Sequence, residues 1–477
     1  MLRRESTMEK KKKASGFSGQ LGFVMAAAGS AVGVGNIWRF PYLAAKDGGG
    51  LFLIIYLILV FTFGFTLLTS DIAIGRYTQK SSIYAYDQVR KGWKFLGVLT
   101  FFVPVIIMTY YSVIGGWVLK YVTVYLTGAH KAAAADDYFT GFITSPAPDV
   151  AFGLVFMLLT SYIVYKGVED GIERYSKFLM PILLVLIVVI AIYCLTIHHT
   201  DASGAVRTGL QGLKVYLTPD LTGLTLGKLL RVTLDAMSQL FFSLSVSMGI
   251  MITYGSYVKK DVDLNKAILQ IDLFDTLVAF LAGMMIVPAI YAFTGTEGMS
   301  AGPGLVFISL PKVFAQMGVM GIVVGALFFI MFTFAALTSS VSVLETVVAN
   351  CMELFHTSRK KTTLVASVVY IIATAVIALG YSYFYVEVKL PNGATGQLLD
   401  IMDYISNSFM MPFISFLSTI LIGWVAKPDF IIGEMTRNGE KFRRKSVYLV
   451  MIKYIAPGMM AILFLQSTGL FAAMGIK

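Results

Sequence analysis

Eleven apolar segments recur along the chain, each about as long as a helix that crosses a lipid bilayer. Their approximate centres are residues 30, 62, 110, 158, 186, 245, 280, 333, 372, 412 and 460. Because the bilayer core offers the backbone no hydrogen-bond partner, such segments fold as helices. Only 14% of the residues are charged, against roughly 25% in a soluble domain. The sequence therefore predicts an all-α polytopic membrane protein with eleven transmembrane helices.

Positive residues gather in alternate loops. They occupy residues 3–13, 76–94, 259–260, 359–361 and 441–445, whereas the loops between carry few of them. This is the positive-inside pattern of cytoplasmic loops. The net charge of +11 is therefore a signal of membrane orientation, and no nucleic-acid partner is expected. We expect a cytoplasmic N-terminus and, after eleven spans, an extracellular or periplasmic C-terminus.

The apolar segments divide into five, five and one. The expected units are a cytoplasmic tail (1–15), a first repeat (16–198), an extracellular loop (199–228), a second repeat (229–425), a cytoplasmic loop (426–446) and an eleventh helix (447–477). An odd number of helices in each repeat inverts the second repeat, so helix 1 corresponds to helix 6. No residue-level repeat is visible, and the division depends on hydropathy and on the breaks described next.

Helices 1 and 6 both contain an interruption of the apolar run. The first reads Gly-Ser-Ala-Val-Gly-Val-Gly-Asn over residues 29–36, and the second reads Ser-Leu-Ser-Val-Ser-Met-Gly over 243–249. Irregular backbone at membrane depth survives where it lines a cavity, and paired breaks point to the ion and substrate site of a secondary transporter. Freed carbonyl oxygens suit Na⁺, and a half-helix N-terminus suits a carboxylate. Close helix packing alone also explains the glycines, but the nearby Asn36, Arg39 and Pro41 favour a site.

Two further groups of polar residues lie inside apolar segments. Asp275 lies well inside helix 7, and a carboxylate there needs a cation, either Na⁺ or a distant Arg or Lys. Helix 8 carries Thr338, Ser339 and Ser340. Such hydroxyls often bond only to carbonyls of their own helix. Beside the freed carbonyls of helix 1, they would instead form an ion site.

Two other pairs of residues are candidates for moving parts. Arg39 and Asp403 lie near the outer ends of helices 1 and 10, where they would form a gate or, alternatively, extend separately to water. Gly171 and Pro181 lie ten residues apart in helix 5. Proline frees a carbonyl and weakens a helix, so this half-helix would unwind or simply bend.

The first-helix sequence from Gly29 to Pro41, followed by Gly48-Gly-Gly50, resembles the signature of the neurotransmitter:sodium symporters. Residues 239–257 resemble their sixth helix and residues 335–340 their eighth. The chain is most similar to bacterial amino-acid members with eleven helices. The resemblance implies the leucine-transporter-like fold, a 5+5 inverted repeat with one extra helix, in a bacterial inner membrane.

The resemblance also implies two sodium sites and a substrate site between the two breaks. The first sodium would bind Ala31, Asn36, Ser243 and Asp275, and the second would bind Gly29, Val32, Ala335, Thr338 and Ser339. Substrate would contact Ala31, Gly33, Val34, Gly35, Ile107, Tyr111, Phe242, Ser243, Ser245, Met248, Ser339 and Val343.

Gates follow from the same resemblance. Phe242 and Tyr111 would form a lid below the Arg39–Asp403 gate. The inner gate would include Ser256, Tyr257 and Glu353. The family's N-terminal arginine aligns with Ala14, and Lys13 is the available substitute.

Three positions bear on substrate and chloride. Monoamine transporters have an aspartate where this chain has Gly33, so the substrate is expected to bring its own carboxylate. The family usually has asparagine at Asp275, and chloride-dependent members place the ion among residues that match Tyr56, Gln239, Ser243 and Ala279. A fixed carboxylate at Asp275 predicts chloride independence. Ser247 replaces a glycine of the leucine-binding relative, which leaves the pocket volume open, whereas Met248 is an adaptable pocket residue.

The sequence thus predicts a sodium-coupled importer of hydrophobic or aromatic L-amino acids that works by alternating access, as a monomer or weak homodimer. A channel, a membrane enzyme and a non-transporting sensor are the alternatives. No filter motif supports a channel, and no nucleophile–base pair, metal spacing or phosphate loop supports an enzyme. A sensor on the same fold stays open.

Overall fold

The computed structural model describes residues 16–200, 204, 206–299 and 302–470. Within these residues, nine helices are long and apolar enough to cross a membrane, and one further span is a pair of helices bent by 55°. A second interrupted pair, separated by residues 244–249, completes the eleven predicted spans. The eleven-helix prediction is confirmed, and α7 (33 residues) and α17 (37 residues) are the longest of these helices.

The first five spans run from residue 20 to residue 195. They are α2 (Gln20–Ala31) with α3 (Val34–Lys46); α4 (Gly50–Leu59), η1 (Val60–Gly64) and α5 (Phe65–Thr78); α7 (Lys94–Leu126); α10 (Pro146–Lys166); and η2 (Val168–Glu173) with α11 (Arg174–Leu195). The π-helical segments η1 and η2 continue into α5 and α11 without a break.

The second five spans begin with the other interrupted helix, and an eleventh follows. They are α13 (Leu226–Ser243) with α14 (Ile250–Ser256); α15 (Leu264–Thr294); α17 (Val319–Phe355); α18 (Arg359–Ala378) with η5 (Leu379–Tyr381); α19 (Leu398–Asp403), η6 (Tyr404–Met410), α20 (Met411–Ile420) and η7 (Leu421–Val425); and α22 (Lys445–Val450), η8 (Met451–Ile455) and α23 (Ala456–Ser467).

Short elements connect the spans at both ends. They are α6 (Ser82–Val89), α8 (His130–Ala133), α9 (Tyr138–Ile143), β1 (His198–Thr200), β2 (Val206–Thr208), α12 (Gly209–Leu217), η3 (Thr296–Gly298), η4 (Leu305–Ser309), α16 (Leu310–Gln316), β3 (Val388–Lys389), β4 (Thr395–Gly396) and α21 (Asp429–Met435). The strands form two antiparallel hairpins, in which His199 pairs with Arg207 and Val388 with Gly396.

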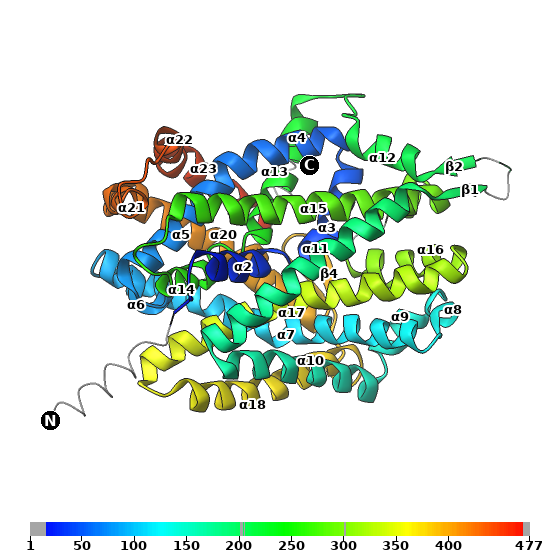
Figure 1. Ribbon diagram of the computed structural model, residues 1–477, viewed down its shortest axis with the longest axis horizontal. Coiled ribbons are helices and arrows are strands. Elements are labelled where there is room, and N and C mark those ends of the chain that lie inside the picture. Colours follow the sequence, from blue (N-terminus) through cyan, green and yellow to red (C-terminus); the bar gives the residue numbers. More distant parts are fainter. Residues whose placement is uncertain (1–15, 201–203, 205, 300–301, 471–477) are drawn as a thin grey trace.

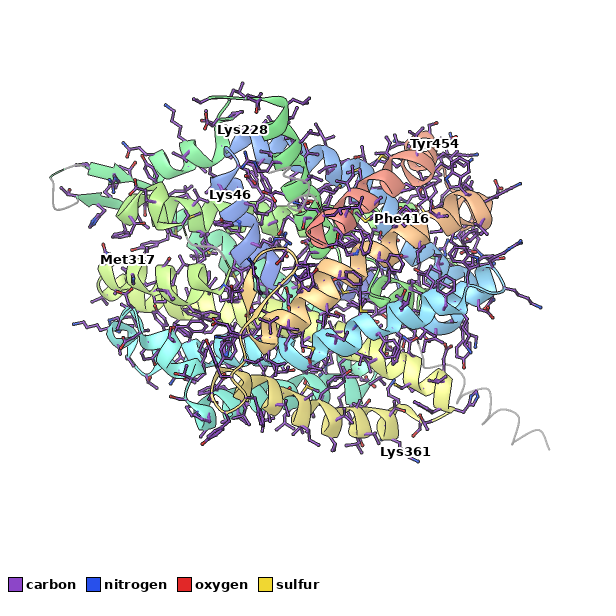
Figure 2. The ribbon with its side chains drawn as sticks, turned by 180° about the vertical axis from the view of Figure 1, so that it is seen from behind. Lys46, Lys228, Met317, Lys361, Phe416 and Tyr454 are labelled. Carbon is purple, nitrogen blue, oxygen red and sulfur yellow. The ribbon has the colours of Figure 1, made fainter. Side chains whose placement is uncertain are left out.

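The connections segregate to opposite ends of the bundle. Figure 1 shows α6, α14, α21 and α22 at one end and β1, β2, α8 and α16 at the other, with the long helices α7, α15 and α17 between. Figure 2, seen from behind, places Lys361 and Met317 near opposite ends. The basic segments that the structure describes, 76–94, 259–260, 359–361 and 441–445, therefore share one end, as the alternating charge pattern predicts.

Glycines let several helices approach each other's backbone. A Cβ atom at Gly75 of α5 would collide with the Ile252 carbonyl of α14, and one at Gly255 of α14 would collide with the Ile72 carbonyl of α5. Helices in membranes associate through such small residues, because lipid offers no hydrophobic driving force between them. The contact joins the second span to the second half of the sixth, α14.

Candidate functional site

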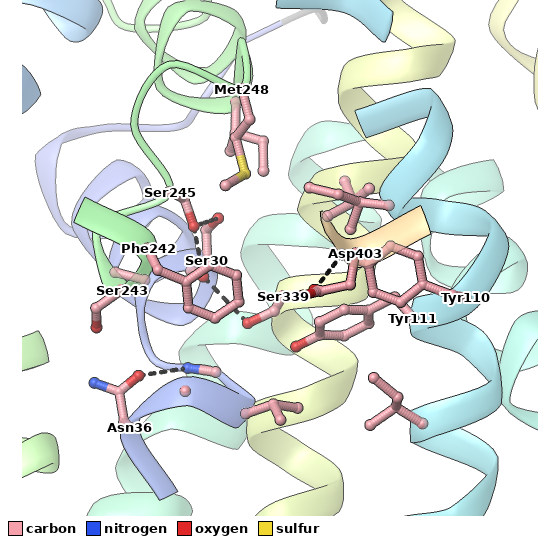
Figure 3. A pocket seen from close by; sticks show the side chains of 18 of the residues that line it. Ser30, Asn36, Tyr110, Tyr111, Phe242, Ser243, Ser245, Met248, Ser339 and Asp403 are labelled. Atoms are coloured by element: carbon pink, nitrogen blue, oxygen red, sulfur yellow. Dashed lines mark hydrogen bonds between the residues drawn. The ribbon is translucent and has the colours of Figure 1, made fainter. Parts of the chain in front are cut away.

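A cavity lies where the two interrupted helices meet α7 and α17 (Figure 3). It is lined by Ser30, Ala31, Gly33, Val34, Gly35, Asn36, Trp38, Ile107, Tyr110, Tyr111, Ile114, Phe242, Ser243, Ser245, Met248, Ile250, Ser339, Val343 and Asp403. All twelve residues that the family resemblance implied for substrate are among them. Figure 3 shows Phe242 and Tyr111 on opposite sides of the Ser339 hydroxyl.

The first helix break brings backbone close to side chains from other spans. The helix ends at Ala31 and restarts at Val34, and the Gly33 amide donates a 3.0 Å hydrogen bond to Asn36 Oδ1. A Cβ at Gly33 would lie 2.8 Å from Ser339 Oγ, and one at Gly35 would lie 2.9 Å from the Phe242 ring. Glycine is therefore required at both positions for this packing.

The second break is held by a carboxylate that sequence reasoning missed. Ser245 and Ser247 have φ angles of 53° and 61°, in the left-handed region that side chains disfavour. The Ser247 amide donates a 2.8 Å hydrogen bond to Asp71 of α5, which is 3% exposed. The Ser247 amide has no partner within the helix, so this bond satisfies it. The bond also helps to hold the left-handed conformation, which costs free energy.

Polar side chains from three spans converge beside the first break. Asn36 Nδ2 donates a 2.8 Å hydrogen bond to Asp275 Oδ1, and Ser243 Oγ donates to both carboxylate oxygens at 2.9 and 3.1 Å. All three side chains are buried, Asn36 and Asp275 fully. The structure thus assembles three of the four residues predicted for the first sodium, and the fourth, Ala31, lines the same cavity. Hard oxygen donors around a buried negative charge suit Na⁺.

The residues predicted for the second sodium lie where α2 meets α17. Ser339 Oγ lies 3.4 Å from the Gly29 carbonyl oxygen and 3.2 Å from that of Val32. Thr338 Oγ1 lies 3.1 Å from the Ala335 carbonyl oxygen, and a Cβ at Gly29 would lie 3.2 Å from Thr338 Cβ. The Ser339 hydroxyl therefore bonds to carbonyls of the first break, whereas the Thr338 hydroxyl bonds to the Phe334 and Ala335 carbonyls of its own helix.

A set of serine hydroxyls links the breaks and was also missed. Ser30 Oγ lies 3.2 Å from Ser245 Oγ and 2.7 Å from Ser342 Oγ, and Ser245 donates to the Ser30 carbonyl at 3.0 Å. The sequence offered a signal, since Ser342 follows Ser339 by about one helical turn and shares its face.

The structure does not bring Arg39 into contact with Asp403. Arg39 Nη2 donates a 2.7 Å hydrogen bond to Ser238, whereas Asp403 accepts from Tyr110 at 3.0 Å and from Asn407 at 2.6 Å. Both side chains line a wide hollow above the substrate cavity, together with Trp38, Asp235, Phe242 and Asp400 among others. The predicted contact between Arg39 and Asp403 is therefore not made in this structure.

The predicted partners of the inner gate are divided between two places. Tyr257 donates a 2.6 Å hydrogen bond to Glu345, which also pairs with Arg359 at 2.5 Å. Glu353 instead accepts from the Ser81 hydroxyl at 2.5 Å. It follows Glu345 by eight residues on α17, about 12 Å along the axis, and this separation carries it past Tyr257.

Of the remaining positions of the predicted inner gate, the structure describes Ser256 but not Lys13 or Ala14. The Ser256 hydroxyl donates to the Thr253 carbonyl of its own helix at 2.7 Å. Lys13 and Ala14 lie outside the described residues. The structure therefore gives no contact between Ser256 and Glu353.

Helix 5 is fully wound in this structure. It runs from Val168 to Leu195 through η2 and α11, with Pro181 inside the helix. A Cβ at Gly171 would collide with the Ile163 carbonyl of α10. A small cavity lies between Ser176 and Leu179 of α11 and Thr338 of α17. This cavity therefore lies between the predicted unwinding segment and Thr338, one of the residues predicted for the second sodium.

Some buried polar atoms near the first site have no hydrogen-bond partner among the described residues. They are both carboxylate oxygens of Asp272, the hydroxyl of Tyr56, Oε1 of Gln239 and Oγ1 of Thr276. Asp272 precedes Asp275 by about one helical turn, and it is fully buried. Sequence reasoning missed it because it lies near the start of the apolar run.

Comparisons with known proteins agree with this geometry. A model of the Sodium:neurotransmitter symporter family matches residues 14–139 and 145–476. An uncharacterised sodium-dependent transporter of Bacillus subtilis is 33% identical over 96% of this chain and 98% of its own length. The human sodium- and chloride-dependent taurine transporter is 24% identical over 87% of this chain and 72% of its own. The crystal structure of MhsT in complex with L-phenylalanine has a TM-score of 0.81 and 34% identity, covering 95% of this chain and 99% of MhsT.

The family match covers nearly the whole chain, and the paired breaks lie where such a transporter requires them. The chain is a multi-pass membrane protein with the leucine-transporter-like fold. It belongs to the sodium:neurotransmitter symporter family, whose members are sodium-dependent transporters.

Proposed function

We propose that this symporter imports hydrophobic or aromatic L-amino acids with sodium and without chloride. The observation that carries the proposal is the cavity between the two breaks, where an apolar wall faces backbone groups and the Asn36 and Ser243 side chains that bond to buried Asp275. The cavity supplies no acidic side chain at Gly33, since even a Cβ there would crowd Ser339. A substrate with its own carboxylate fits this arrangement.

The apolar side of the cavity supports the choice of side chain. Ile107, Phe242, Met248 and Val343 are predicted to contact the substrate side chain, and Trp38, Ile114 and Ile250 also line the cavity. MhsT, of similar fold, has been solved with L-phenylalanine. We assign the amino group to the carbonyls of the two breaks, and the carboxylate to the Gly33 and Gly35 amides, the Tyr111 hydroxyl and the first sodium.

Two sodium sites support coupling. Ala31, Asn36, Ser243 and Asp275 would hold the first, and Gly29, Val32, Ala335, Thr338 and Ser339 the second. The Asp275 carboxylate supplies the negative charge that chloride would otherwise bring, so transport is independent of chloride. Each sodium that enters down the membrane potential contributes about 2.3 kcal/mol per 100 mV.

Alternating access would proceed through the gates described above. Closing the hollow above the cavity would bring Arg39 to Asp403, with Phe242 and Tyr111 forming the lid beneath. Unwinding of helix 5 between Gly171 and Pro181 would then admit water through the small cavity beside Thr338. Sodium would leave first and substrate second. Rearrangement of Tyr257, with Ser256 and Glu353 nearby, would open the inner side.

We place the protein in a bacterial inner membrane with a cytoplasmic N-terminus, acting as a monomer or weak homodimer. The basic loops at one end of the bundle support this orientation.

Uptake by purified protein in vesicles tests the proposal. Radiolabelled amino acids are offered with an inward sodium gradient, and chloride is replaced by gluconate in parallel. We expect saturable accumulation of phenylalanine or leucine that vanishes without sodium and persists without chloride. Flux that does not saturate would favour a channel, and binding without accumulation would favour a sensor.

A further inference from the structure

A hollow of about 650 Å³ lies on the outer surface of the bundle, between the inner ends of α10 and α11. Its lining consists of Tyr162 and Lys166 from α10, Asp170 from η2, and Arg174, Tyr175 and Phe178 from α11. It is separate from the substrate cavity and from both predicted sodium sites. The residues are those expected at a membrane surface, where apolar side chains meet basic ones.

The two basic side chains of the hollow are not neutralised within the described part of the chain. Neither Lys166 nor Arg174 has a carboxylate within ion-pair distance there, although Lys166 lies 5.2 Å above the Tyr162 ring. Nearby Lys177, in contrast, is paired with Glu173 at 2.5 Å. With Asp170 counted, the lining carries one net positive charge, which matches an anion of charge minus one.

An apolar track leads from the hollow along the outside of the bundle. Tyr162 and Leu158 of α10 are 51% and 54% exposed, and Phe178 and Val185 of α11 are 64% and 61% exposed. These residues recur at spacings that keep them on one face of each helix. A molecule seated here would meet cations at one end and apolar side chains over the rest of its length.

We propose that this hollow binds the headgroup of an anionic phospholipid, with the acyl chains lying along the exposed faces of α10 and α11. Basic pockets on the cytoplasmic side of transmembrane helices recognise acidic headgroups in this way. A phosphodiester would lie between Lys166 and Arg174, and the Tyr162 and Phe178 rings would contact the glycerol and upper chains.

The position of the two cations gives the lipid a regulatory role. Lys166 immediately precedes Gly167 and Arg174 immediately follows η2, so the pair brackets the first turns of helix 5. A phosphate bound to both would hold these turns wound. This consequence rests on the proposed unwinding of helix 5 during transport. Bound lipid would therefore slow the opening of the cytoplasmic side.

Hydrogen exchange of the full-length protein in nanodiscs tests the site without any need for transport. Amides of residues 167–178 are compared in phosphatidylcholine alone and in phosphatidylcholine with phosphatidylglycerol. We expect slower exchange with phosphatidylglycerol in the wild type and no such difference in the double variant Lys166→Gln/Arg174→Gln. Two basic side chains, each contributing about a fivefold factor, predict about twenty-fivefold weaker lipid binding in that variant.

Two control variants separate charge from folding. The exchange variant Lys166→Arg/Arg174→Lys keeps both charges and should keep the protection. The variant Lys441→Gln/Arg443→Gln removes a lysine and an arginine from the loop before α22, and it should behave as the wild type. Equal exchange of the wild type in the two lipids, or protection that persists in Lys166→Gln/Arg174→Gln, would overturn the proposal.

Two further arms identify the ligand and separate this inference from the transport proposal. Glycerol 1-phosphate added to phosphatidylcholine nanodiscs should give no protection, and protection by it would replace the lipid with a soluble anion and contradict the proposal. Uptake is measured in the same lipids. Protection by phosphatidylglycerol in a protein that accumulates no amino acid would leave the lipid site standing and remove the transport proposal.

Discussion

Asn36 donates its side-chain amide to the Asp275 carboxylate across 2.8 Å, and so joins the first helix break to the middle of α15. The same carboxylate accepts the Ser243 hydroxyl, so one buried negative charge is shared by spans 1, 6 and 7. An ionised carboxylate in such a place is costly unless it is paired with a cation and fully hydrogen bonded. The hydrogen bonds from Asn36 and Ser243 satisfy the carboxylate oxygens, and the proposed sodium supplies the cation that the buried charge requires.

Replacing Asp275 by Asn removes that charge while keeping the shape. We expect uptake either to be lost or to become dependent on chloride, because an external anion would then have to balance the first sodium. Uptake is measured in chloride and in gluconate. Asp272→Asn makes the same chemical change one turn earlier on α15, and it should not create a chloride requirement. Chloride-independent uptake by Asp275→Asn at the wild-type rate would remove the proposed role of Asp275.

Replacing Ser339 by Ala removes a hydroxyl from the second sodium site. We expect the sodium concentration for half-maximal uptake to rise about tenfold, because roughly one charge-assisted contact is lost. Ser340→Ala is the matched control. Its hydroxyl lies 2.9 Å from Thr160 rather than at the break, so stability should fall while sodium dependence stays unchanged. Equal sodium dependence in both variants would contradict the assignment.

Replacing Asp71 by Ala releases the amide of Ser247. Loss of a hydrogen bond to a buried charged group typically costs about 1.5–3 kcal/mol. We expect substrate affinity, measured by equilibrium binding, to fall about tenfold to a hundredfold because the second break loses its anchor. Ser70→Ala is the matched control, because the Ser70 hydroxyl lies next to Asp71 but bonds to Thr66 and Tyr448. Affinity as in the wild type for Asp71→Ala would show that the break keeps its shape unaided.

Replacing Pro181 by Ala restores a helix donor in α11. We expect slower uptake at saturating substrate and little change in sodium affinity, because a stronger helix unwinds less readily. Pro104→Ala makes the same change inside α7, which is not expected to open. Stopped-flow measurement of sodium release distinguishes a slower opening from slower binding of substrate or sodium. Faster or unchanged release in Pro181→Ala would speak against unwinding at this position.

Asp47, at the end of α3, predicts a dependence of stability on pH. Burial raises the pKa of its carboxyl to about 7, well above the value of about 4 in an unfolded chain. A raised pKa means that the contribution to stability is complete below about pH 4 and is lost as the pH rises through about 7. Asp47→Asn should make the melting temperature depend less on pH when it is measured from pH 4 to pH 8. A curve parallel to that of the wild type would contradict the prediction.

The sequence was sufficient for the spans and the breaks, because apolar length and polar residues in lipid leave few alternatives, whereas the sodium ligands stay a prediction. The structure places the Ser339 hydroxyl against the freed carbonyls of helix 1, whereas the Thr338 hydroxyl bonds to carbonyls of its own helix. Glu345 was missed because two acidic residues lie eight apart on α17, and sequence alone does not say which one reaches Tyr257. Asp71 was missed because it lies far along the chain from the break it holds. The separation of Arg39 from Asp403 depends on the conformational state, which residue spacing does not encode.

The reciprocal glycines of α5 and α14 limit how the transporter can move. With Gly75 and Gly255 each seated on the other helix's backbone, neither helix can rotate or slide without driving atoms into its neighbour. We therefore expect α14 to move together with α5 as one rigid body. Bending of the sixth span is then confined to the residues between Ser243 and Ile250.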